Sequence, residues 1–492
     1  MIRVTVPAEA NGLPLALWLS RMGYSAILPC GGAGRCGNCR VSLLSGKLLD
    51  VDDPTKELLP DEHGEVRACR ALISGVETVV GIPDGWDAPG AGEERRYYPT
   101  GALDIGTTTL ALRLRGDDGR ITELTAQNPE SVFGADVASR ITATEEKGVE
   151  PVRACLLNRL RTLLGRCRVG RLSVVGNPTM IHIFAGVSPA SIGIAPFTPV
   201  FSGSREITGE SIGLPVETVV LLPAIKDAGY LGSDLVAGAA ASGVLDSPCP
   251  AIYLDLGTNG EILLSTGKEN GGHLYAASCA VGPCFEGAGI SSGAGGIPGA
   301  VSRVKKQDGE FVFSTVGGLA PIGITGSGLI DLFAVLLEDG TVARDGRLAE
   351  PFTLTGRQTY PDGTLSTPFE TPVTLDQKDV RAVQTAKAAV RAGIAALLHA
   401  AWIDPDEVGT VLIAGSFGRY LDPASAAKIG LLPEQWASDA RAVGNAALEG
   451  ADLALSSEDT RESVKRIATT AHAVDLNSSP AFRESFLSQL DF

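Results

Sequence analysis

The sequence predicts a small α+β domain at the N-terminus, followed by a larger α/β module built from two similar halves. Three observations support this fold class. Cysteines and glycines crowd into one short loop at residues 28–41. A stretch rich in Pro, Gly and charge follows at 83–99, and alanine, glycine and aliphatic runs dominate the chain after it. Two later segments, 101–114 and 251–264, share one pattern of strand, Asp-x-Gly-Thr turn and strand, which indicates a duplication and two lobes.

The elements around the cysteine loop fit a compact domain. "IRVTV" at 2–6 alternates like a strand, and "LPLALWLSRMG" at 13–23 has the spacing of a short amphipathic helix. A strand-like "CRVSLL" follows the loop, and "ETVVGIP" at 77–83 predicts a closing strand. The segment between the first strand and the helix is too short for a full second strand, so we expect an abbreviated opening hairpin.

Four cysteines have the spacing of an iron–sulfur site. Cys30, Cys36 and Cys39 follow the pattern C-x5-C-x2-C, and Cys69 comes later in "EVRACRALI". Plant-type [2Fe–2S] clusters use C-x4-C-x2-C and a distant Cys, so this chain has one extra residue in the first gap. Glycines in the loop let backbone N–H groups approach sulfur closely. The pattern predicts that these four thiolates bind a [2Fe–2S] cluster, in a domain that resembles the β-grasp ferredoxins of the plant and adrenodoxin type.

Three other interpretations of the loop are weaker. Zinc can be bound by four cysteines, but structural zinc sites usually pair two C-x2–4-C knuckles and only one knuckle is present. Gly32, Gly34 and Gly37 form a G-x-G-x-x-G string, but a strand-like segment follows it where a dinucleotide site needs a helix. A disulfide framework is typical of small secreted domains, which this chain is not.

Length, charge and hydropathy limit the function. The chain has 492 residues, enough for several domains, and a formal net charge of −16 without a basic run. Nucleic acid and an anionic membrane are therefore not expected as main partners. No run of eighteen apolar residues occurs, and no basic-then-apolar leader opens the sequence, so a cytoplasmic location is expected. The five other cysteines are scattered and are expected to be small buried hydrophobes.

The repeated turn has the chemistry of a phosphate site. Glycine lets the backbone approach an oxyanion, and successive N–H groups in a tight turn form an anion-binding nest. Asp104 and Asp255 end the two strands, where they can hold Mg²⁺ directly or through water. Asp-x-Gly-Thr is also a common hairpin turn, but two copies in matched contexts favour a pair of loops that hold a nucleotide's phosphates from both sides. The expected nucleotide-binding residues of the turns are Gly106, Thr107, Thr108, Gly257, Thr258 and Asn259.

Further candidates follow along the chain. The strand in "VLIAGSFGRY" at 411–420 runs into a small-residue turn before a helix, which suits packing against adenosine. "GSG" at 326–328 opens an apolar helix and is a candidate anion site. Asp234 lies on a helix of small residues and is a candidate to orient water or Mg²⁺, but an ordinary solvated or capping role explains it equally well. Glu286 has the same two interpretations, and for this residue the structural one is preferred. The residues assigned to nucleotide binding here are Gly326, Ser327, Gly328, Gly415, Ser416 and Gly418.

The order of these loops resembles that in the acetate and sugar kinase, Hsp70 and actin (ASKHA) superfamily, which implies a duplicated, ribonuclease H-like, two-lobed ATPase. No Walker A string is present, which excludes a P-loop NTPase by pattern. The predicted organisation is a ferredoxin domain, a linker, a first lobe, and a second lobe with the adenosine loop and C-terminal helices. The boundaries are 1–83, 84–99, 100–248 and 249–492.

The ferredoxin loop together with "LDIGTTT", "VGNPTM", "LDLGTNGE", "GPCFEGAGI", "IGITGSGLID" and "IAGSFG" resembles one family, the ATP-dependent reductive activators of corrinoid proteins. The resemblance implies that a corrinoid protein of a methyltransferase system, oxidised to inactive Co(II), is returned to Co(I). It also implies a [2Fe–2S] cluster, ATP and Mg²⁺ as cofactors and a low-potential electron donor, and it is compatible with a homodimer. Some longer relatives carry an additional domain after the linker, and we do not expect one here, because only residues 83–99 separate the two modules.

Three rival functions stay open from the sequence. A small-molecule kinase with a fused redox domain would transfer phosphate to an added acceptor. An electron-transfer protein that only senses nucleotide would bind ATP without turnover. An activator of hydroxyacyl-CoA dehydratases ranks last, because that type bridges a [4Fe–4S] cluster across a dimer and lacks an N-terminal ferredoxin loop.

Overall fold

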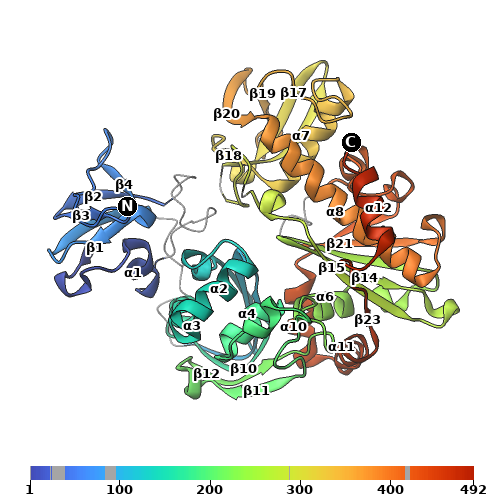
Figure 1. Cartoon of the computed structure of the whole chain (residues 1–492), viewed down its shortest axis with the longest axis horizontal. Coiled ribbons are helices and arrows are strands. Elements are labelled where there is room, and N and C mark those ends of the chain that lie inside the picture. The colour runs from blue at the N-terminus through green and yellow to red at the C-terminus, as the bar shows by residue number, and fades with distance from the viewer. Residues whose placement is uncertain are drawn as a thin grey trace. The chain divides into compact units, whose positions relative to one another are not determined.

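A computed structural model of the chain describes residues 2–22, 24, 39–83, 96–287, 289–297, 299–415 and 421–492. The described chain divides into two compact units, 1–232 and 233–492 (Figure 1). Buried apolar side chains form three separate clusters, one in the N-terminal part, one in the rest of the first unit and one in the second unit. No helix within the described ranges combines the length and apolarity needed to cross a membrane.

The N-terminal part is rich in β-structure. Its elements are β1 (Ile2–Val6), α1 (Leu15–Arg21), β2 (Arg40–Ser45), β3 (Leu48–Asp50), β4 (Glu65–Arg67), β5 (Ala71–Ile73) and β6 (Thr78–Ile82). Four strands form an antiparallel sheet in the order β1-β6-β2-β4, and β3 pairs with β5. The strands expected at 2–6, after the loop and at 77–83 are confirmed. A short 3-10 turn at Ala8–Ala10 is the only regular element between β1 and α1 in the described chain, so the abbreviated opening is confirmed as well.

The rest of the first unit is a six-stranded mixed sheet with helices against it. Its elements are β7 (Tyr97–Ile105), β8 (Thr109–Arg115), β9 (Ile121–Gln127), α2 (Val137–Lys147), α3 (Val149–Leu164), β10 (Arg168–Gly176), α4 (Pro178–Ala185), α5 (Ala190–Gly193), β11 (Arg205–Thr208) and β12 (Val216–Leu221). The strand order is β11-β12-β10-β7-β8-β9, with β7 to β9 as an antiparallel meander and β10 parallel to β7.

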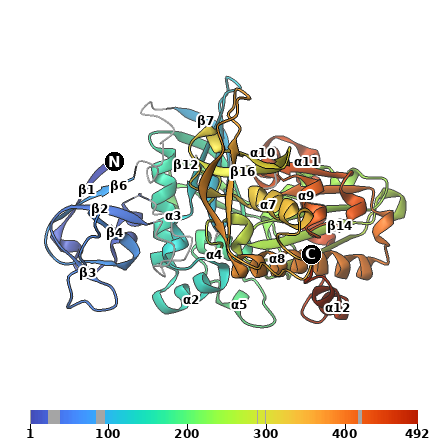
Figure 2. The same ribbon diagram turned by 90° about the horizontal axis from the view of Figure 1, so that it is seen from above.

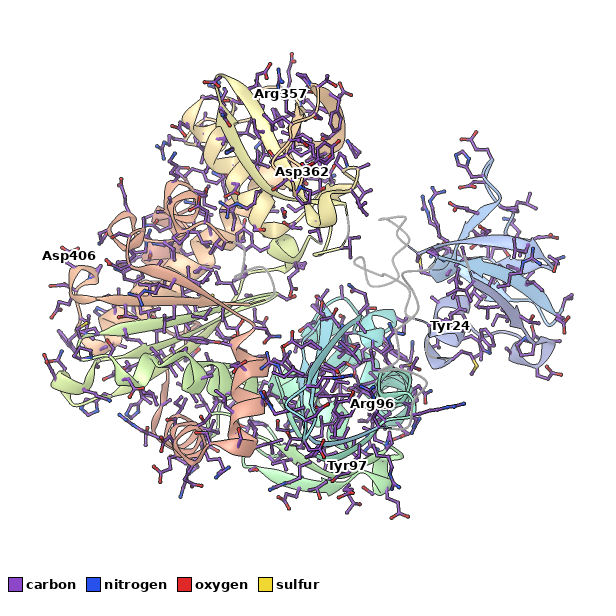
Figure 3. The ribbon with its side chains drawn as sticks, turned by 180° about the vertical axis from the view of Figure 1, so that it is seen from behind. Tyr24, Arg96, Tyr97, Arg357, Asp362 and Asp406 are labelled. Atoms are coloured by element: carbon purple, nitrogen blue, oxygen red, sulfur yellow. The ribbon has the colours of Figure 1, made fainter. Side chains whose placement is uncertain are left out.

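Strand β7 begins earlier than the sequence predicts. Its first residue is Tyr97, labelled with Arg96 in Figure 3, whereas the linker was expected to extend to residue 99. Tyr97 pairs with Arg168 at the start of β10, so the pairing with β10 extends the strand into the expected linker. The aromatic and charged residues before the apolar run conceal this start in the sequence.

The second unit repeats the same plan and adds to it. Its first sheet contains β13 (Ala251–Leu256), β14 (Asn259–Ser265), β15 (Leu274–Ala280), β21 (Thr410–Ala414), β22 (Ala440–Gly444) and β23 (His472–Ala473). Strands β13 to β15 form an antiparallel meander and β21 runs parallel to β13, as β10 does to β7. The duplicated architecture expected from the repeat is therefore confirmed.

Helices cover both faces of this sheet. Figure 1 shows α6 (Ser233–Ser242) with α10 (Ala446–Ser456) and α11 (Glu458–Thr470) on one face, and α8 (Gln377–Ala401) with α12 (Pro480–Ser488) on the other. Small residues let α6 and α10 cross closely, because a Cβ on Gly450 would lie 2.0 Å from the Ala237 carbonyl oxygen.

A second sheet of five strands has the order β18-β16-β17-β19-β20, and α7 packs on it (Figure 2). The remaining bounds are β16 (Ala300–Gln307), β17 (Glu310–Thr315), β18 (Gly323–Ile324), α7 (Gly326–Glu338), β19 (Phe352–Gln358), β20 (Phe369–Leu375) and α9 (Pro423–Lys428).

Candidate cluster and nucleotide sites

The fold brings two of the four predicted cluster ligands together. Cys39 immediately precedes β2, and Cys69 lies in a 3-10 turn after β4. Their Sγ atoms are 3.2 Å apart, and the Ala68 amide donates to the Cys39 carbonyl oxygen at 2.8 Å. Cys30 and Cys36 lie outside the described residues. Within the described ranges no group of three or more His, Cys, Asp or Glu residues could hold a metal.

The local electrostatics favour a thiolate at Cys39. The hydrogen bond with Cys69 lowers the pKa of the Cys39 thiol to about 6, although burial opposes the shift. Backbone N–H groups and the positive charge of Arg67 also lower the pKa. Because the thiolate is the form that binds metal, this pair fits the predicted iron–sulfur site.

The first Asp-x-Gly-Thr turn joins β7 to β8. Asp104, half-buried at the end of β7, lies beside Val175 of β10 and opposite Ala111 of β8. The Gly106 amide donates to the Thr109 carbonyl oxygen at 3.0 Å and closes the turn. A Cβ on Gly106 would lie 2.7 Å from that same oxygen, so the turn requires glycine here.

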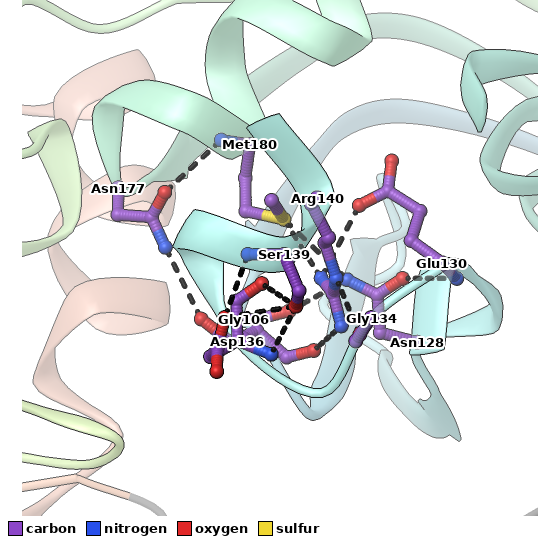
Figure 4. Close-up of polar contacts among 10 residues, drawn as sticks. Gly106, Asn128, Glu130, Gly134, Asp136, Ser139, Arg140, Asn177 and Met180 are labelled. Atoms are coloured by element: carbon purple, nitrogen blue, oxygen red, sulfur yellow. Dashed lines mark hydrogen bonds and ion pairs between the residues drawn. The ribbon is translucent and has the colours of Figure 1, made fainter. Parts of the chain in front are cut away.

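Three side chains from other segments bind this turn (Figure 4). Asn128 Nδ2 donates to the Gly106 carbonyl oxygen at 2.8 Å, and Arg140 Nη2 donates to the Thr107 carbonyl oxygen at 2.5 Å. Asn177 Nδ2 donates to Thr107 Oγ1 at 3.2 Å, while its Oδ1 caps α4 by accepting from the Met180 amide. Residues 128–140 and Asn177 therefore hold the first turn in place.

Arg140 is bound on several sides. Its guanidinium contacts Glu130 Oε2 at 3.3 Å and the Gly134 carbonyl oxygen at 3.2 Å, and both side chains of the ion pair are almost fully buried. Burial raises the pKa of Glu130 to about 7, and the positive charge of Arg140 and the hydrogen bond with Asn128 only partly oppose it. Glu130 Oε1 has no hydrogen-bond partner in the described chain.

This burial predicts a pH dependence of stability. The pKa of Glu130 is about 7 in the folded chain, above its ordinary value of 4.5, so the folded state binds a proton more tightly than the unfolded state. The stabilisation is complete below pH 4.5 and is lost as the pH rises through 7. We expect the free energy of unfolding of the parent protein to fall by up to about 3 kcal/mol relative to Glu130→Gln across this window. Denaturant titrations at pH 5, 6, 7 and 8 measure it, and parallel profiles for the two proteins would contradict the assignment.

The second turn joins β13 to β14 and has a carboxylate beside it. The Gly257 amide donates to the Asn259 carbonyl oxygen at 3.0 Å. Thr258 Oγ1 donates to Glu286 Oε2, and Glu286 Oε1 lies 3.4 Å from the position of a Cβ on Gly257. Glu286, for which a structural role was preferred, therefore lies at the predicted nucleotide loop.

Acidic groups gather around Asp255. The Tyr253 hydroxyl donates to Asp255 Oδ2 at 3.3 Å. Burial raises the pKa of Asp255 to about 6, and the charge of Glu286 adds to this while the Tyr253 hydrogen bond opposes it. Burial also raises the pKa of Tyr253, with a further contribution from Asp234 on α6. Asp234 thus acts on the same tyrosine that is bonded to Asp255, but the described carboxylates do not by themselves form a group that could hold a metal, so Mg²⁺ at Asp255 stays a prediction.

The expected adenosine turn begins at the same sheet edge. Ala414, the last residue of β21, pairs with Asp255, and Gly415 follows with a φ of 112°. A Cβ on Gly415 would lie 2.2 Å from the Leu256 carbonyl oxygen, so only glycine fits beside the second turn. Ser416 and Gly418 lie outside the described residues.

The 326–328 segment begins α7, as expected. A Cβ on Gly326 would lie 1.9 Å from the Phe285 carbonyl oxygen, which places this helix start directly beside the segment that carries Glu286. Thr325 caps the helix by accepting from the Gly328 amide at 3.2 Å, and Ser327 Oγ donates to the Ser302 carbonyl oxygen at 3.0 Å. The described contacts of Ser327 are therefore structural, and a contact with nucleotide stays a prediction.

Comparisons with known proteins agree with this arrangement. Residues 100–247 match the family model for the RACo middle region, and 250–492 match that for the C-terminal domain of RACo, the ASKHA domain. The chain is 30% identical over 418 residues to the corrinoid activation enzyme RamQ of Eubacterium limosum, covering 78% of this chain and 69% of RamQ.

A second relative is the [Co(II) methylated amine-specific corrinoid protein] reductase of Methanosarcina barkeri, 27% identical over 439 residues, with 80% of this chain and 76% of the reductase covered. Among solved structures, the reductive activator for corrinoid, iron-sulfur protein aligns with a TM-score of 0.72 and 24% identity. The alignment covers 99% of this chain and 96% of that one, which supports the fold along the chain.

Proposed function

Since the chain belongs to the RACo family, we propose that it is an ATP-dependent reductive activase that returns an inactive Co(II) corrinoid protein to Co(I) for methyl transfer. The main observation that supports this function is that one chain combines two kinds of site. One is the thiol pair of Cys39 and Cys69 in a β-rich domain. The other is the pair of Asp-x-Gly-Thr turns at the ends of β7 and β13.

In this proposal the N-terminal domain, 1–83, carries a [2Fe–2S] cluster on Cys30, Cys36, Cys39 and Cys69. The linker ends before Tyr97, where β7 begins, and the two ASKHA lobes follow it. Their expected boundary is 248/249, although α6, which precedes that boundary, belongs to the second compact unit. Both repeated turns bind the phosphates of ATP, with Mg²⁺ near Asp104 and Asp255 and water oriented by Asp234. The helix start at 326–328 and the turn from Gly415 complete the nucleotide site.

Energetics explain why both modules are needed. Plant-type [2Fe–2S] centres have potentials near −400 mV, and Co(II) in its resting ligation is harder to reduce than that. For a one-electron step, each 59 mV uphill lowers the equilibrium constant about tenfold. A conformational change driven by ATP can offset this difference if it alters how the corrinoid is bound or ligated.

We further propose that the chain receives its electron from a low-potential donor and acts in the cytoplasm. The proposal is compatible with a homodimer. All cysteines in the described ranges are free thiols, which is consistent with a reducing compartment. Corrinoid proteins are the partners named for the relatives.

The test is reduction of a Co(II) corrinoid protein followed by Co(I) absorbance. We expect rapid Co(I) formation with reductant, ATP and Mg²⁺, and little without ATP or with a non-hydrolysable analogue. Equal rates and extents with and without ATP would contradict the proposal. Transfer of phosphate to an added sugar or acid would instead favour a kinase.

A further inference from the structure

The back of the first turn is occupied by two hydrogen-bond donors on successive peptide groups. Asn128 Nδ2 binds the Gly106 carbonyl oxygen at 2.8 Å, and Arg140 binds the Thr107 carbonyl oxygen at 2.5 Å (Figure 4). These carbonyls belong to the two peptide planes that span Gly106 to Thr108. Side chains from outside the hairpin therefore fix the orientation of both planes.

Because the peptide group is planar, the direction of each carbonyl also fixes the direction of the next amide. In a planar trans peptide the C=O and the next N–H point in opposite directions. Because the Gly106 and Thr107 carbonyls point toward Asn128 and Arg140, the amides of Thr107 and Thr108 point away from them. Two successive amides directed to one side form the concave arrangement that binds phosphate oxygens.

Arg140 is itself held in place. Its Nε donates to the Gly134 carbonyl oxygen at 3.2 Å, and its guanidinium pairs with Glu130 Oε2 at 3.3 Å. Burying such a pair is expensive, and apolar side chains of similar volume usually stabilise a fold as well or better. Packing alone therefore does not account for a buried guanidinium directed at a turn carbonyl.

The second turn is not held by an arginine side chain from the described residues. The Gly282 amide donates to the Thr258 carbonyl oxygen at 3.0 Å, as the Asn128 amide donates to that of Thr108 at 2.8 Å. In the described chain, however, no Lys or Arg side chain bonds to residues 257–259, and Glu286 accepts from Thr258 instead. The repeat has preserved the Asp-x-Gly-Thr pattern, although the second turn closes one residue earlier, and among the described residues a cationic side chain lies behind the first copy alone.

We propose that Arg140 is a positioning residue of the nucleotide site: by holding the Thr107 carbonyl, it directs the amides of the first turn toward the phosphate chain of ATP. This inference rests on the proposed function, because it takes ATP as the ligand of the turn. Arg140 acts through the turn and does not itself contact the nucleotide.

The test compares two arginines of the same unit. Arg153 also binds a main-chain carbonyl, that of Phe184 at 2.9 Å, and a glutamate, Glu150 at 3.3 Å, but it is not bonded to the turn. The experimental variant combines Arg140→Met with Glu130→Gln, so that no unpaired charge stays buried, and Arg153→Met is the control. Calorimetry measures the Kd for ATP–Mg²⁺, and melting temperature and cluster absorbance report folding.

We expect the Kd for ATP–Mg²⁺ to rise at least about tenfold in the double variant, which is the usual effect of losing a charged hydrogen bond. In Arg153→Met the Kd should stay within about twofold of the parental value. Arg140→Lys keeps a positive charge beside Glu130 without the planar fork, and we expect it to show an intermediate Kd if the double variant does not fold. Parental affinity in a folded double variant or in Arg140→Lys would overturn the positioning role. Failure of the parent protein itself to bind ATP would instead refute the proposed function.

Discussion

Cys69→Ser is expected to remove the [2Fe–2S] cluster and to abolish Co(I) formation. The parent protein should hold about two irons and two sulfides per chain, and the variant almost none. Cys69 is one of the four predicted ligands, and its Sγ lies 3.2 Å from Cys39 Sγ. The substitution therefore removes a predicted ligand and also the hydrogen bond that lowers the pKa of the Cys39 thiol. Iron and sulfide analysis with visible absorbance measures the effect, and ATP binding should persist.

The matched control is Cys249→Ser, the same change at a half-buried free thiol of the second unit that is bonded to Ser247. It should retain the parental iron content and colour. Cys39→Ser should behave like Cys69→Ser, because both thiols belong to the predicted ligand set. Full iron content and an unchanged spectrum in either ligand variant would refute the cluster assignment.

Asp255→Asn should lower ATP turnover about a hundredfold or more, since removal of one group that stabilises charge in a transition state commonly has this effect. The substitution preserves the shape of the side chain and removes its charge. Asp255 lies at the end of β13 beside the second turn, where burial holds its pKa at about 6, so it is ionised at pH 8. Phosphate release at saturating ATP and pH 8 measures the change, and the cluster spectrum should not change.

Asp246→Asn serves as the control, because this exposed aspartate of the same unit pairs with Lys268 at 2.8 Å and is not bonded to either turn. It should hydrolyse ATP at the parental rate. Asp104→Asn tests the first turn in the same way. A parental rate in either turn variant would show that its carboxylate does not have the assigned role.

Together these variants separate the two half-reactions. A chain without the cluster should still hydrolyse ATP, whereas a chain with Asp255→Asn should still accept an electron from the reductant. Neither should form Co(I), because the proposed activation requires both steps.

The local and periodic features of this protein could be predicted from the sequence. Alternating apolar residues placed the strands of the β-rich domain, and their match with β1, β2 and β6 follows from the burial of one face of a sheet. The Asp-x-Gly-Thr repeat predicted two similar meanders, because a tight turn between apolar strands imposes its own residue types. The spacing of the cysteines predicts a cluster, and the structure brings Cys39 and Cys69 together, while the cluster itself stays a prediction.

The side chains that support the first turn could be found only from the tertiary structure. Asn128, Arg140 and Asn177 come from three segments after the turn, and nothing periodic links them to it. Strand β10 lies parallel to β7, so Asn177, which follows β10, lies beside the turn. Asn128 follows β9 and contacts the turn from that strand. Glu286 likewise follows β15 and reaches Thr258 only in the folded chain. The positions of the turns and of the candidate thiols could be found from the sequence by itself, since a tight turn demands particular residues and cysteine spacing can be counted directly. Their polar partners depend on strand order, and a buried carbonyl accepts any well-placed donor, so no local pattern marks which residue supplies it.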